Sequence, residues 1–69
     1  MKYKIALEPV ETVPDDARVR HYDELDYGAK GHFPDVVERG ERLIDRETAR
    51  QFSDGEFVKY TGYFRVLLA

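Results

Sequence analysis

The sequence predicts a small α+β domain, in which an antiparallel β-sheet of three to four strands carries one main helix packed on one face. Two observations lead to this prediction. The runs near both ends of the chain are rich in aromatic and β-branched residues, which is typical of strands. Residues 45–52 combine a helix-capping residue with a helical spacing of apolar side chains.

The first predicted strand is Lys2–Glu8, where apolar and polar residues alternate as in a half-buried strand. We expect it to pair with the β region at the end of the chain. Pro9 and Pro14 bracket the next four residues. Because proline has no N–H to donate to a β-ladder, this stretch is expected to be a loop or a frayed edge.

Residues 15–25 fit two interpretations. Pro14 followed by two acids is typical of a helix start, where negative charge meets the positive end of the helix dipole. However, residues 17–22 alternate with a period of two, which indicates a strand. We favour the strand. Residues 23–32 are polar and contain two glycines, so they are expected to form an exposed loop.

A helix is indicated from Phe33, with Pro34 in its first turn and a break near Gly40, because glycine costs about 1 kcal/mol relative to alanine in a helix. The main helix is expected at residues 45–52, with Asp45 as its N-cap. Its buried stripe is expected to consist of Ile44, Thr48, Ala49 and Phe52.

The last β region, Glu56–Leu68, holds two apolar runs separated by Thr61 and Gly62. This pattern predicts a hairpin whose turn uses glycine for a positive φ angle. One long strand with a glycine bulge is the alternative.

The length of 69 residues indicates a single domain, and the aromatic content of 13% favours a folded one. The chain has no cysteine, which excludes disulfides and suits a reducing compartment. No apolar run approaches the roughly 18 residues that cross a bilayer. We therefore expect a cytoplasmic protein without a membrane association.

Negative charge is concentrated in the first half of the chain. The net charge of the whole chain is −3, whereas residues 8–38 contain nine acids and only three bases. Carboxylates on a rigid scaffold can imitate a phosphate backbone and attract a protein with a basic surface, and tyrosines add contact area. The alternative is that the acids serve solubility alone. The predicted partner-binding residues are Asp15, Asp16, Tyr22, Asp23, Glu24, Asp26 and Tyr27.

No residue pattern indicates an enzyme. His21 and His32 lack a helical metal-binding spacing and an obvious third ligand, so no metal is expected. The Gly28–Gly31 segment does not have the spacing of a phosphate-binding loop, and no cofactor is expected. Paired acids would need a cleft for acid/base chemistry, and a chain of this size offers little room for one.

Four arginines recur every three or four residues and could line one helical face that binds phosphates. Acids are interleaved with them, which favours a surface of ion pairs over direct nucleic-acid binding. These arginines are Arg39, Arg42, Arg46 and Arg50.

The chain has a small size, an acidic cluster from Asp15 to Asp26 and a β-rich ending from Phe57 to Leu68. In these features it resembles small acidic phage-encoded inhibitors of the anti-CRISPR type. The resemblance rests on no shared motif and carries over no functional residue. It implies a protein-binding inhibitor that blocks a basic surface of a bacterial defence complex, for example a CRISPR effector subunit, in the host cytoplasm. A homodimerising structural or regulatory domain is the alternative, since small sheets often bury an edge against a second copy.

Overall fold

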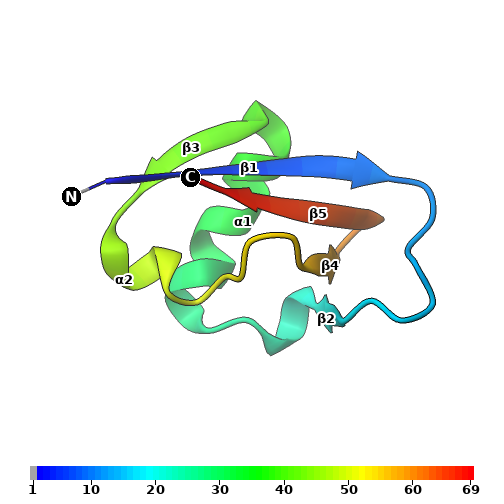
Figure 1. Cartoon of the computed structure of the whole chain (residues 1–69). Coiled ribbons are helices and arrows are strands. Elements are labelled where there is room, and N and C mark those ends of the chain that lie inside the picture. Colours follow the sequence, from blue (N-terminus) through cyan, green and yellow to red (C-terminus); the bar gives the residue numbers. More distant parts are fainter. Residues whose placement is uncertain (1) are drawn as a thin grey trace.

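The computed structural model describes residues 2–69. It confirms a small α+β fold, but the sheet has five strands in the order β2-β4-β5-β1-β3 (Figure 1). β2 runs parallel to β4, whereas all other neighbouring strands are antiparallel. The prediction of a purely antiparallel sheet of three to four strands was therefore wrong in both respects. The strands are β1 (Tyr3–Val10), β2 (Val19–His21), β3 (Glu41–Ile44), β4 (Phe57–Lys59) and β5 (Tyr63–Leu68).

One main helix lies against one face of the sheet, as predicted, but it is α1 (Tyr27–Arg39) and not the segment 45–52. The prediction of a loop at residues 23–32 was wrong, because the second half of this segment forms the start of α1. Ala29, Phe33 and Val36 are spaced four and three residues apart and are all buried on the sheet side. Their burial offsets the cost of the glycines in the same helix.

The second helix, α2 (Arg46–Ala49), is shorter than predicted. Asp45 is its N-cap, as expected, and accepts a 2.8 Å hydrogen bond from the backbone N–H of Thr48. This bond, together with one from the Thr48 hydroxyl, lowers the pKa of the Asp45 carboxyl below its ordinary value. The predicted buried stripe is confirmed for Ile44, Thr48, Ala49 and Phe52.

β1 pairs with the end of the chain, as predicted, and places Leu7 opposite Val66. It continues through Pro9 to Val10, beyond its expected end. Lys4 and Ala69 exchange both backbone hydrogen bonds, so the N–H groups of even-numbered residues of β1 point toward β5. The nitrogen of Pro9 therefore faces the other side, where the pairing with β3 has already ended, and no ladder bond is lost.

The hairpin between β4 and β5 is confirmed, with residues 60–62 as its loop. The expected role of Gly62 is wrong, because within residues 2–69 only Gly40 and Gly55 have positive φ angles, of 89° and 85°. The loop is instead closed by a 2.8 Å hydrogen bond from the Tyr60 N–H to the Gly62 carbonyl. Gly40 ends α1 in this conformation, which confirms the predicted break.

Two glycine substitutions should have opposite effects on stability. Gly31 lies inside α1 with open space around its Cα, so Gly31→Ala should raise the free energy of unfolding by about 1 kcal/mol. Gly40→Ala should lower it by about 1–2 kcal/mol, because its positive φ is strained for a residue with a Cβ. Urea denaturation followed by circular dichroism measures both changes. Equal effects of the two variants would contradict the assigned conformations.

The core is an aromatic cluster centred on Phe33, which is 1% exposed. The Phe33 ring lies 5.5 Å from that of Tyr60 and 6.1 Å from that of Phe64, both in edge-to-face geometry. Tyr22 and Phe52 lie on its other sides, with ring centroids at 5.6 and 6.5 Å. Phe33 therefore joins α1 to the sheet, to η1 (Tyr22–Glu24) and to the segment after α2.

Candidate functional site

The acidic segment forms a well-anchored corner between β2 and α1. The backbone N–H of His21 donates a 2.8 Å hydrogen bond to Glu24 Oε2, which closes the single turn of η1. Leu25, 5% exposed, follows in the core. Asp26 is the N-cap residue of α1, and its carbonyl accepts the first helical bond from the Lys30 N–H. A short, hydrogen-bonded backbone therefore fixes the positions of these acids.

Tyr22 supports this corner from inside the protein. Its ring is half-buried against Phe33 and Tyr60. Its hydroxyl donates a 3.0 Å hydrogen bond to the Lys30 carbonyl. That carbonyl has no helical partner, because Pro34 stands four residues later inside α1 and has no N–H. The prediction that Pro34 lies in the first turn of its helix was therefore wrong. The Tyr22 hydroxyl replaces the N–H that Pro34 lacks as the donor to the Lys30 carbonyl.

Tyr27 projects from the first turn of α1 and is 95% exposed, which is unusual for an aromatic residue. Three exposed acids precede it in the chain. We call these four residues, Asp23, Glu24, Asp26 and Tyr27, the Tyr27 surface. A shallow hollow of about 270 Å³ adjoins it, with Tyr22, Tyr27, Lys30 and Gly31 as its walls. Lys30 Nζ lies 3.8 Å from Asp23 Oδ1 and offsets the charge of one acid. Because the surface holds three acids, it keeps an excess of negative charge.

The two remaining predicted residues lie elsewhere. Asp15 and Asp16 are exposed in a turn that is closed by a 3.0 Å hydrogen bond from the Ala17 N–H to the Pro14 carbonyl. This turn precedes β2, whereas the Tyr27 surface follows it. The structure therefore divides the predicted acidic face into two groups at opposite ends of β2 (Figure 1).

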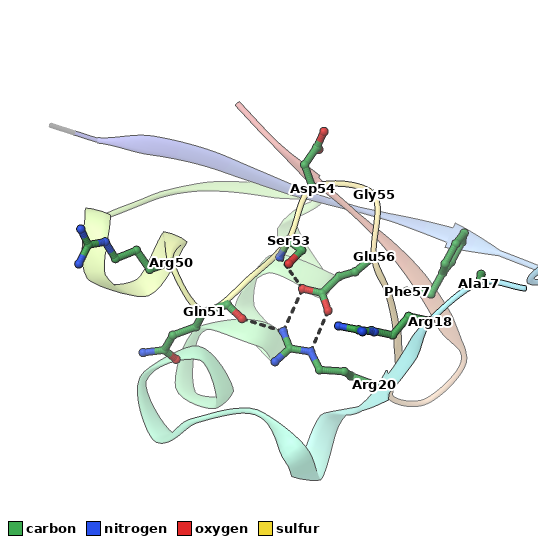
Figure 2. Close-up of a pocket in the computed structure, with 10 residues that line it drawn as sticks. All are labelled: Ala17, Arg18, Arg20, Arg50, Gln51, Ser53, Asp54, Gly55, Glu56 and Phe57. Atoms are coloured by element: carbon green, nitrogen blue, oxygen red, sulfur yellow. Dashed lines mark hydrogen bonds and ion pairs between the residues drawn. The ribbon is translucent and has the colours of Figure 1, made fainter.

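An ion pair between a partly exposed arginine and a buried glutamate, which sequence reasoning missed, anchors β2. Arg20 Nε and Nη2 donate hydrogen bonds of 2.8 and 2.9 Å to the two carboxylate oxygens of Glu56 (Figure 2). Nη2 also donates to the Gln51 carbonyl at 2.7 Å, and the Ser53 N–H donates to Glu56 Oε2 at 2.6 Å. The Glu56 side chain is only 6% exposed. This pair stands at the floor of a surface pocket of about 510 Å³.

The four arginines considered for nucleic-acid binding do not share a helical face. Arg39 ends α1 and Arg42 lies in β3, while Arg46 is the first residue of α2 and Arg50 is its C-cap. Arg39 and Arg42 both form ion pairs with Asp35, at 3.0 and 2.7 Å. The four arginines therefore do not form the continuous helical stripe that was considered as an alternative, and the favoured ion pairing is observed for Arg39 and Arg42.

A family model described as "Family of unknown function (DUF7979)" matches residues 2–67, almost the whole chain. The chain belongs to this family. No curated protein and no solved structure matches it. The assignment to DUF7979 does not bear on the resemblance to anti-CRISPR inhibitors, which stays a prediction.

Two other sequence features of this DUF7979 domain are placed by the structure. The Gly28–Gly31 segment lies in the first turns of α1 and is not a loop. His21 is exposed at the end of β2, while His32 is half-buried in α1. Within residues 2–69, no three His, Cys, Asp or Glu side chains gather as a metal site would require. None of the helices in this range is both long and apolar enough to span a membrane.

Proposed function

We propose that this DUF7979 domain is a non-catalytic binding module that docks the Tyr27 surface on a basic protein surface. The exposure of Tyr27 carries the proposal. A tyrosine supplies rigid contact area at low entropic cost and is enriched where proteins bind one another. The neighbouring carboxylates of Asp23, Glu24 and Asp26 supply a field that steers a basic partner and fixes its orientation.

The anchoring of the surface supports a binding role. Glu24 is held by the His21 N–H, and Tyr22 and Leu25 fix the corner in the core. A surface that is already ordered loses little conformational entropy when it binds. Its acids are exposed to solvent, whereas acid/base catalysis uses carboxyl groups enclosed in a cleft. An inhibitor of a bacterial defence complex would use such a surface, and that specific role stays a prediction.

The proposal is tested by NMR titration of the ¹⁵N-labelled protein with an oligoarginine peptide at low ionic strength. We expect saturable shifts at residues 23–27. Reversing Asp23 and Asp26 to lysine should weaken binding by roughly tenfold or more, since each exposed ion pair contributes up to about 1 kcal/mol. Tyr27→Ala should weaken it at unchanged charge. Glu24 is left intact because it closes η1.

The matched control reverses Asp15 and Asp16, which changes the net charge by the same amount at the other end of β2. If this control weakens binding as much as the first variant, net charge rather than the Tyr27 surface determines binding, and the proposal is wrong. Capture of a protein from a bacterial lysate supports the proposal only when Tyr27→Ala abolishes the capture and the control does not.

A homodimer is the second candidate, and one observation favours it. β3 is an edge strand of the sheet, and its Leu43 is 62% exposed. An open edge with an exposed leucine can pair with the same strand of a second copy. Light scattering over a range of protein concentrations distinguishes the two candidates, because only the homodimer gains mass with concentration.

A further inference from the structure

We propose that the pocket above the Arg20–Glu56 pair binds a small organic phosphate, with Arg18 as the main contact. The pocket lies between β2, the end of α2 and the segment leading into β4 (Figure 2). Its volume of about 510 Å³ falls within the range of about 300–1,000 Å³ that is usual for small-molecule sites.

The charges around the pocket favour an anion. Three arginines and two acids line it, which leaves a positive surplus in a chain of net charge −3. Arg20 and Glu56 neutralise each other through two hydrogen bonds. Asp54 Oδ1 accepts the N–H of Leu68, and Figure 2 shows this side chain pointing away from the pair. Within residues 2–69, neither Arg18 nor Arg50 forms an ion pair.

The two free arginines have different positions. Figure 2 shows the guanidinium of Arg18 pointing into the pocket, toward Glu56, while Arg50 extends outward at the rim. A guanidinium binds phosphate oxygens through two parallel N–H groups, and the field of a second arginine adds to this attraction. Within residues 2–69, the Arg18 guanidinium forms neither an ion pair nor a side-chain hydrogen bond, so it is available to a ligand.

The ligand class follows from the neighbours of Arg18. A phosphate monoester carries nearly two negative charges at neutral pH, so it gains more than a carboxylate from two arginines. Phe57 is half-buried and is among the residues that line the pocket, so it provides an apolar contact at the pocket edge, with its ring turned away from the Arg20–Glu56 pair. A phosphate attached to an aromatic or nucleoside body satisfies both features.

The test is NMR titration with adenosine monophosphate, inorganic phosphate, adenosine and benzoate. We expect saturable shifts at Arg18 and Phe57 with adenosine monophosphate, weaker ones with inorganic phosphate and none with adenosine. Equal binding of adenosine, or the absence of saturable shifts, would overturn the proposal. Binding of benzoate as tight as that of adenosine monophosphate would overturn the assignment to phosphate.

Three variants locate the site. Arg18→Ala should reduce the affinity for adenosine monophosphate by about tenfold or more, the usual cost of losing a charged hydrogen bond. Arg50→Ala should have a smaller effect that disappears at high salt. Arg46→Ala is the matched control, because Arg46 is exposed but lies outside the pocket. Equal losses in the Arg18 and Arg46 variants would refute the site. The Tyr27 surface is unchanged throughout, so this outcome is independent of the proposed protein binding.

Discussion

Phe33→Ala should destabilise the domain by about 3–5 kcal/mol, the usual cost of removing a buried phenylalanine ring. Phe33 is 1% exposed and has four aromatic neighbours, from η1, the segment after α2, the hairpin loop and β5. Folded proteins have about 0.05–0.15 kcal/mol of stability per residue, or roughly 3–10 kcal/mol for a chain of this length. The loss is therefore a large fraction of the total stability, and at the lower end of this range it is enough to unfold the domain.

Urea denaturation followed by far-ultraviolet circular dichroism measures this effect. Phe33→Leu retains most of the volume and should be less destabilising than Phe33→Ala. Tyr27→Ala is the matched control, because it removes an aromatic ring that is 95% exposed, and its effect should stay within about 0.5 kcal/mol. A Phe33→Ala variant about as stable as the Tyr27→Ala variant would show that Phe33 is not the centre of the core.

Arg20→Ala should have the second largest effect, a loss of about 2–4 kcal/mol. Removing one partner of a buried ion pair leaves an unpaired charge and typically costs about 3–5 kcal/mol, which is reduced here because the Arg20 side chain is 30% exposed. Glu56 would keep only the Ser53 N–H as a donor. Glu56→Gln should cost less, because the neutral amide tolerates burial and Arg20 can reach water.

A double-mutant cycle of Arg20→Ala and Glu56→Ala should give a smaller loss than the sum of the single losses, since each variant removes the same interaction. The control is the exposed pair of Lys4 and Glu41, whose side chains are 53% and 55% exposed. Exposed pairs contribute at most about 1 kcal/mol, so Lys4→Ala should have little effect. Similar losses for Arg20→Ala and Lys4→Ala would contradict a structural role for the buried pair.

The sequence alone was sufficient to predict the elements whose residue patterns are local. β1 and the β4–β5 hairpin were predicted from alternation and aromatic content, and Asp45 from its capping position. The start of α1 was missed because its two glycines, and the acids that precede it, are typical of loops. The spacing of Ala29, Phe33 and Val36 was the available signal for this helix. β3 was missed because three of its four residues are exposed, so it lacks a buried alternation.

The candidate sites were less predictable, because they depend on contacts between distant residues. Arg20 and Glu56 are 36 positions apart, and no local pattern links them. Tyr22 was predicted to be a surface residue of the acidic face, but its ring contributes to the core. Its hydrogen bond to Lys30 could have been anticipated from Pro34 only after residues 27–39 were known to be helical.

The strand order has a consequence for how the chain acquires its structure during synthesis. β1 pairs with β3 and β5, and β2 pairs with β4, so residues 2–40 contain no complete strand pair. Ile5 and Leu7 stay without their sheet neighbours until much later residues have left the ribosome. The chain loses conformational entropy when these long loops close, before the burial of apolar side chains between the strands lowers the free energy. The sheet can therefore be completed only after β4 and β5 have been made, because β2 needs β4 and the interior strand β1 needs β5 as a neighbour.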